Sequence, residues 1–141
     1  MSDDKWMLQG CPVSGPSLST DKNGALRVVW YAAGEAGAPG LYFAETRDGG
    51  RSFSPRALLM QESVKGTPAL AAGNGRTVAI WQGTADQQIE TKMRELGGAG
   101  AAVSVAANAE LPSGAFVNDK LFIAYVSKVG EKRSVWLAKV G

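Results

Sequence analysis

The stretch that decides the fold is "TPALAAGNGRTVAIWQ", residues 67–82. It combines a strand of small apolar residues after a proline, a tight Asn-Gly turn, and a second strand that ends near a tryptophan. The pattern recurs in "GPSLSTDKNGALRVVWY", residues 15–31, and in "PSGAFVNDKLFIAYV", residues 112–126. Three copies of one hairpin pattern predict a repeat architecture built from β-strands.

A third strand is expected after each hairpin, in "GLYFAETRDGG" (40–50), "QIETKMRELGG" (88–98) and "SVWLAKVG" (134–141). A fourth is expected in "FSPRALLM" (53–60) and "AAVSVAA" (101–107), whereas the third copy ends without one. The segment "KWMLQG" precedes the first copy and is typical of an outer strand, with Trp6 as the anchor of a latch.

The repeat length of about 45 to 50 residues is that of a four-stranded propeller blade. We therefore predict an all-β fold with three such blades in a single domain. The latch strand would take residues 1–10, blade 1 residues 11–62, blade 2 residues 63–108, and blade 3 residues 109–141 without its outer strand.

The composition excludes several classes of function. The 141 residues are 45% hydrophobic and 20% charged, with a net charge of +2, which is typical of one globular domain without a nucleic-acid-binding or membrane-binding surface. Histidine is absent, which excludes Ser-His-Asp and Cys-His catalysis. Cys11 is the sole cysteine, so no intrachain disulfide is available, and we expect a small buried thiol rather than a nucleophile. No metal or other cofactor is expected.

The stretch "TRDGGRSF" matches the Asp-box pattern, Ser/Thr-x-Asp-x-Gly-x-Ser/Thr-Trp/Phe, through Thr46, Asp48, Gly50, Ser52 and Phe53. Together with "GCPVSGP" (10–16), it resembles the sialidase-like propellers of the bacterial neuraminidase repeat group, in particular their C-terminal half. Asp48 is expected to accept backbone hydrogen bonds within its own turn, and Phe53 to pin that turn to the blade. The box is therefore predicted to be structural rather than catalytic.

Three blades do not close a ring, so two end faces would expose apolar side chains. At about 25 cal/mol per Å², several hundred Å² of such surface costs on the order of 10 kcal/mol per face. We expect a homodimer that forms a six-bladed ring, in which each N-terminal strand completes the other chain's third blade. The alternative is that the chain is half of a longer propeller. The N-terminus lacks the features of a signal peptide, so the chain as written is expected in the cytoplasm, whereas the resemblance implies export.

The resemblance implies that a sialidase would need three arginines for the substrate carboxylate, a Tyr-Glu nucleophile pair and an aspartic acid. Of the seven arginines, only Arg133 is expected on the ligand face. We therefore predict a non-catalytic module that binds a small polar ligand or a carbohydrate, or serves as an assembly scaffold. The alternative is an exo-sialidase-like glycoside hydrolase or its C-terminal fragment. The ligand-face candidates are Tyr31, Glu35, Lys65, Gln82, Asp86, Glu110 and Arg133. Trp30, Trp81 and Trp136 are expected to pack between blades.

Overall fold

The computed structural model describes residues 14–34 and 37–141, and this part of the chain is composed of strands and turns without a helix. Sheet 1 contains β1 (Ser17–Thr20), β2 (Leu26–Ala32), β3 (Gly40–Thr46) and β4 (Ala57–Met60). Sheet 2 contains β5 (Lys65–Gly73), β6 (Arg76–Ala85), β7 (Gln88–Glu95) and β8 (Val103–Ala107). Sheet 3 contains β9 (Ala109–Val117), β10 (Lys120–Val129) and β11 (Lys132–Val140). The all-β prediction is confirmed.

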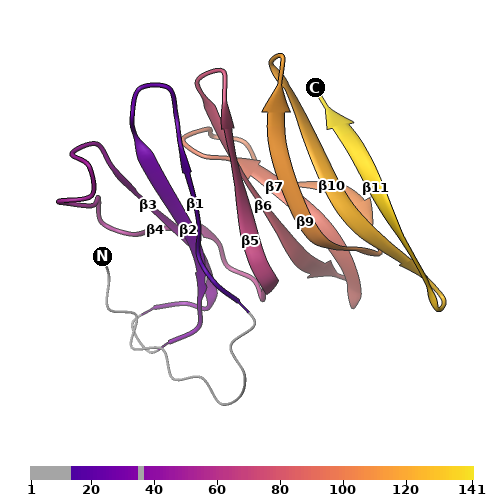
Figure 1. Cartoon of the computed structure of the whole chain (residues 1–141). Helices are drawn as coiled ribbons and strands as arrows, with labels where there is room; N and C mark the ends of the chain where they lie inside the picture. The colour runs from indigo at the N-terminus through magenta and orange to yellow at the C-terminus, as the bar shows by residue number, and fades with distance from the viewer. Residues whose placement is uncertain (1–13, 35–36) are drawn as a thin grey trace.

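Each sheet is antiparallel, with its strands in chain order from one edge to the other. The three sheets stand side by side, and their first strands β1, β5 and β9 are neighbours (Figure 1). The turns within the hairpins use residues that tolerate left-handed backbone, since Asn74 and Asn118 have φ of 49° and 46°. The Asn-Gly and Asn-Asp signals in the sequence therefore mark these turns correctly.

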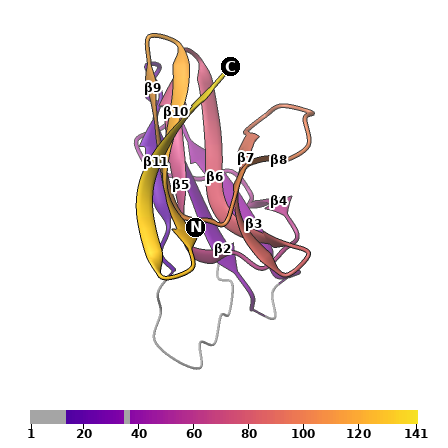
Figure 2. The ribbon, with the colours of Figure 1, turned by 90° about the vertical axis from the view of Figure 1, so that its right-hand side faces the viewer.

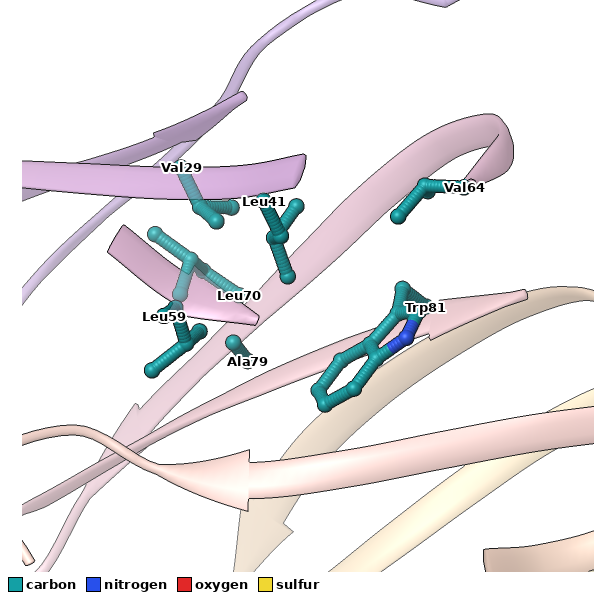
Figure 3. Packing of buried hydrophobic residues seen from close by; sticks show 7 residues of the cluster. All are labelled: Val29, Leu41, Leu59, Val64, Leu70, Ala79 and Trp81. Atoms are coloured by element: carbon teal, nitrogen blue, oxygen red, sulfur yellow. The ribbon is translucent and has the colours of Figure 1, made fainter. Parts of the chain in front are cut away.

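The first core lies between sheets 1 and 2 (Figure 3). Val29 and Leu41 come from sheet 1, Leu70 and Ala79 come from sheet 2, and Trp81 lies fully buried against them. Residues alternate between the two faces of a strand, so the side chains of Trp81 and Ala79 point to sheet 1 while Ile80 points to the other side. The predicted packing of Trp81 between repeats is confirmed.

The second core lies between sheets 2 and 3 and uses the opposite face of sheet 2. Val78 and Ile80 pack there against Leu121 and Ile123 of β10, and all four are almost completely buried. Gly114 of β9 is required for this contact, because a Cβ at that position would overlap the Cδ1 atom of Ile80. Sheet 2 thus has buried apolar residues on both faces, as expected for a layer between two others.

The prediction that Trp136 packs between repeats is wrong. This residue lies on β11, opposite Tyr125 of β10, and its side chain is 57% exposed. The residue of sheet 3 that corresponds to Trp81 is Tyr125, which is partly buried against the second core. The aromatic position of the repeat is therefore on the second strand, and Trp136 lies on the third.

Candidate functional site

The predicted ligand face corresponds to one end of the sheets, which we call the ligand end. Four connecting segments lie at this end, which is the lower end in Figure 1. They are the β4–β5 connection (61–64), the β6–β7 turn (86–87), residue 108 and the β10–β11 turn (130–131). Hydrogen bonds fix part of this end, since Asn108 N donates to Ile89 O at 2.8 Å and Lys128 N donates to Asn108 O at 3.2 Å. Segments of sheets 2 and 3 are thus joined at this end by backbone contacts.

A cavity of about 270 Å³ at the ligand end is lined by residues of sheets 2 and 3 and by Asn108 and the β6–β7 turn. Its lining consists mostly of hydrogen-bonding side chains, namely Gln87, Gln88, Asn108, Glu110 and Lys128, with Ile89 as the apolar member. Amides donate and accept, the carboxylate accepts and the ammonium donates. This donor and acceptor set, beside one apolar wall, suits a small ligand with several hydroxyl groups.

Glu110 is the group of this cavity with unused hydrogen-bonding capacity. Its Oε1 atom is buried, and no hydrogen-bond donor of the described residues reaches it. The Arg133 Nε atom lies 3.5 Å away, which is an ion-pair contact across the sheet rather than a hydrogen bond. A buried carboxylate oxygen without a donor is a natural acceptor for a ligand hydroxyl or a water molecule.

The other predicted ligand residues are spread over this end of the sheets. Gln82 is buried, and its Oε1 atom accepts a hydrogen bond of 3.2 Å from Leu111 N, so its side chain joins β6 to β9. Lys65 begins β5 in register with Gln82 and is exposed, and Asp86 lies exposed in the β6–β7 turn. Tyr31 packs partly buried against the first core. Ligand binding by these side chains stays a prediction.

Three residues that the sequence singled out lie outside the described part of the chain. They are Trp6, Cys11 and Glu35. The predicted latch and the predicted place of Glu35 on the ligand face therefore remain predictions.

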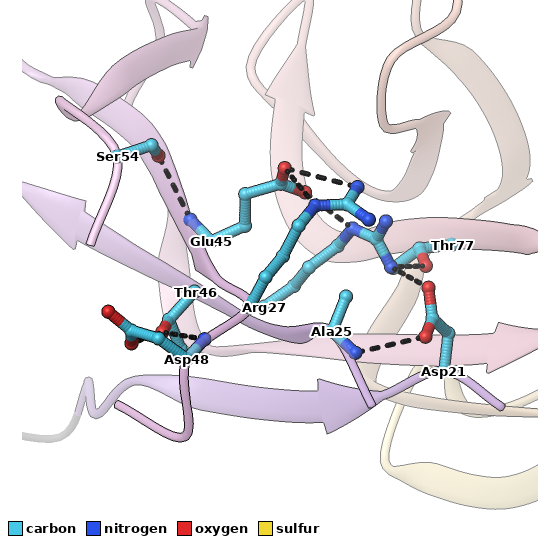
Figure 4. Close-up of polar contacts among 9 residues, drawn as sticks. Asp21, Ala25, Arg27, Glu45, Thr46, Asp48, Ser54 and Thr77 are labelled. Atoms are coloured by element: carbon cyan, nitrogen blue, oxygen red, sulfur yellow. Dashed lines mark hydrogen bonds and ion pairs between the residues drawn. The ribbon is translucent and has the colours of Figure 1, made fainter. Parts of the chain in front are cut away.

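The arginines lie mostly at the opposite end of the sheets or in contacts between them. Arg27 Nη1 donates to Asp21 Oδ2 and to Thr77 Oγ1, both at 3.0 Å, while its Nε pairs with Glu45 at 3.2 Å (Figure 4). Because Thr77 belongs to sheet 2, Arg27 fastens sheet 1 to sheet 2 at the end opposite the ligand end.

Three further arginines are also engaged away from the ligand end. Arg76 pairs with Glu95, Arg94 donates to Leu59 O, and Arg47 lies 3.4 Å from Glu45. Of the arginines whose ion pairs are described above, Arg133 is the one at the ligand end, where it lies beside Glu110.

The turn between β3 and β4, where the sequence matches the Asp-box pattern, is held by Asp48. The Oδ1 atom of Asp48 accepts hydrogen bonds from Ser52 N at 3.0 Å and from Thr46 Oγ1 at 2.7 Å, and Ser52 Oγ donates to Oδ2. Gly49 and Gly50 have φ of 72° and 89°, which the turn requires. The hydrogen bonds from Ser52 and Thr46 hold the pKa of Asp48 far below its ordinary value. The predicted backbone hydrogen bond within the turn is confirmed.

The sequence analysis missed a polar cluster on the face of sheet 2 that meets sheet 1. The Lys92 Nζ atom lies 2.8 Å from Glu62 and 3.1 Å from Glu90, and Trp81 Nε1 donates to Glu62. Ser104 Oγ donates to the other oxygen of Glu90 at 2.5 Å. The hydrogen bond from Ser104, together with Lys92, lowers the pKa of Glu90 although burial opposes the shift.

The side chains of this cluster are mostly buried, and their ion pairs hold the 61–64 connection against sheet 2. The alternation of Glu90 and Lys92 along β7 was the one signal in the sequence, because it places both on one face. Nothing in the sequence showed that Glu62 meets them.

Comparisons with known proteins give no match, either to a protein-family model or to a curated protein. Within the described residues, no helix has the length and apolar character that a membrane crossing requires. The same residues contain no group of three or more cysteine, aspartate or glutamate side chains placed to hold a metal ion.

Proposed function

We propose that this chain is a non-catalytic assembly module, in which two copies close a six-bladed ring of the sialidase-like propeller type. The ligand end of that ring would bind a small hydroxylated ligand such as a carbohydrate. The observation that carries the proposal is the set of exposed apolar side chains on the outer faces of sheets 1 and 3, at the two ends of the stack.

The open face of sheet 3, which we call its forward face, is apolar. Cross-strand register places Ala124 beside Leu137, and Val126 beside Val135, on the side of the sheet away from sheet 2. Val135 and Leu137 are 78% and 65% exposed. In sheet 2 the corresponding forward face carries Ile80, which packs on sheet 3. The forward face of sheet 3 therefore has the composition of a face that another sheet covers.

The rear face of sheet 1, which points away from sheet 2, is only partly open, because Val28, Tyr42 and Ala44 on it are 5% exposed or less. Trp30 lies there beside Tyr42, at the repeat position that Trp81 occupies in sheet 2. Leu18 and Leu58 lie on the same face, and their side chains are 65% and 43% exposed. Because Trp81 packs on the sheet before it, Trp30 is placed to pack on a sheet that the described chain does not contain.

The free energy that favours closure is large. If each face covers roughly 400 Å² of apolar surface, burial at about 25 cal/mol per Å² favours contact by roughly 10 kcal/mol per face. In a two-fold dimer, the forward face of each sheet 3 meets the rear face of the other sheet 1, so both open faces of both chains are covered.

The catalytic alternative has less support. A carboxylate-binding triad would need three arginine forks converging at the ligand end, and most of the described arginines are engaged elsewhere. The cavity beside Glu110 instead supports binding of a neutral polar ligand.

Light scattering after gel filtration tests the assembly. A mass twice the 14.7 kDa of the chain at micromolar concentration is expected, and a monomer that stays dispersed would overturn the proposal. A fluorogenic sialoside should give no turnover with the dimer, whereas turnover that purifies with the protein would favour the hydrolase. Binding of neutral sugars, followed by calorimetry, should weaken when Glu110→Gln replaces the carboxylate.

A further inference from the structure

Strand β11 leaves one edge of sheet 3 open. In sheets 1 and 2 the third strand is followed at the outer edge by β4 and β8, whereas β11 has no outer neighbour among the described residues. Figure 2, which views the chain from the side of sheet 3, shows β11 running in front. Val135, Trp136 and Leu137 are all more than half exposed, so both faces of this strand are uncovered. An apolar strand with free backbone groups along one edge is a template for a further strand.

The path of the chain shows where the missing strand belongs. Each outer strand leads directly into the first strand of the next sheet, since β4 ends at Met60 before β5 begins at Lys65, and β8 ends at Ala107 before β9 begins at Ala109. By the same rule, a sheet that covered the rear face of sheet 1 would take its outer strand from the residues before β1. In the closed ring, that sheet is sheet 3 of the second copy.

We propose that residues 5–10 of one chain, "KWMLQG", add to the open edge of β11 in a second copy and complete its third sheet. This inference rests on the proposed dimer. The segment has six residues, which is enough for a strand as long as β4 or β8, with four and five residues, and it carries consecutive apolar side chains at Trp6, Met7 and Leu8. Its own β11 is less suitable as a partner, because β1 and β11 lie at opposite ends of the stack with sheet 2 between them (Figure 1).

Charge favours the same pairing. The residues before the segment include Asp3 and Asp4, whereas β11 carries Lys132, Arg133 and Lys139 and no acidic residue. Opposite charges at the ends of two strands help to set their register when they associate. The exposed indole of Trp136 offers a further apolar contact for an added strand.

Photo-crosslinking in the full-length chain tests the exchange. A benzophenone amino acid replaces Met7, and chains with light and heavy nitrogen are mixed in equal amounts, unfolded together and refolded before irradiation. If the strand is exchanged, peptides of residues 5–10 become linked to peptides of β11. About half of these products then join a light to a heavy chain, as random pairing of two copies requires. The same probe in place of Lys22, which lies exposed in the β1–β2 turn, should give no link to β11.

The outcomes separate this inference from the dimer itself. Strand exchange is overturned if the sample has the dimer mass but shows no link to β11, or if every link to β11 joins residues of the same isotope. Either result leaves the proposed dimer unchanged. A sample of monomer mass overturns the proposed function, and strand exchange with it.

Discussion

Replacing Leu137 by aspartate provides a quantitative test of the proposed ring. In the single chain this side chain is 65% exposed on the forward face of sheet 3, so L137D should change the free energy of unfolding of the monomer by less than about 1 kcal/mol. In the ring the side chain would be covered. Complete burial of a leucine contributes about 1.5–3 kcal/mol, and the exposed two thirds therefore about 1–2 kcal/mol.

The effect on the dimer is doubled by symmetry. The proposed ring would contain two identical contacts between sheet 3 and sheet 1, so L137D should weaken dimerisation by about 2–4 kcal/mol, or about 30- to 700-fold in the dissociation constant. Desolvation of the aspartate adds to this loss. Sedimentation equilibrium over a dilution series measures the constant directly.

The matched control is Val129→Asp. Val129 is 74% exposed, which is similar to Leu137, but it lies at the end of β10 next to the β10–β11 turn rather than in the middle of the forward face. V129D should leave the dissociation constant within about threefold of the wild-type value, as expected for a rim position. Equal effects of L137D and V129D would refute the assignment of the forward face as the contact surface.

Two further predictions concern the stability of the single chain, and urea unfolding measures both. Gly40→Ala should destabilise it by about 2–3 kcal/mol, because the new Cβ would overlap the backbone carbonyl of Met60. The control Gly100→Ala, whose Cβ meets no atom, should change the free energy of unfolding by less than about 0.5 kcal/mol. Equal effects of the two substitutions would contradict this packing. Lys92→Met should cost about 2–3 kcal/mol at pH 7 by leaving partly buried carboxylates unpaired. The pKa of Glu90 is lowered from its ordinary value of 4.5. The ion pair of Glu90 with Lys92 therefore stabilises the fold fully above pH 4.5, and this contribution is lost as the pH falls through the lowered pKa. The difference between K92M and wild type should therefore shrink below about pH 4.5, and a constant difference would exclude an electrostatic origin.

The strands and turns of this protein were predictable because their signals are local. Alternating apolar residues identify a strand that is buried on one face, and the residues at Asn74 and Asn118 identify turns that need left-handed backbone. The Asp-box turn was predictable for the same reason, since Asp48 binds groups within four residues of itself. Such contacts depend on spacing along the chain and on nothing further away.

Contacts between sheets were not predictable from the sequence, because they depend on how far each strand slides along its neighbour. Glu62 meets Lys92 across thirty residues, and Arg27 meets Thr77 across fifty. A shift of one residue in either register would turn these side chains to the other face of the strand. The exposure of Trp136 was not predictable for a similar reason, since it depends on whether another strand or sheet covers β11.

The polar groups at the ligand end would also give the proposed contact its orientation. On the forward face of sheet 3, Glu110 is the cross-strand neighbour of Val126, which pairs in turn with Val135, so a charged group borders the apolar surface at one end. The nearby Arg133 pairs with it at 3.5 Å. If the two sheets slid along each other, apolar side chains of the partner would cover Glu110 and Arg133. Removing these charged groups from water costs free energy unless each keeps a hydrogen-bonding or ion-pair partner. In the proposed ring, the apolar middle of the face would supply the attraction, and the charged end would restrict the two chains to one register, with the cavity beside Glu110 near the contact between them.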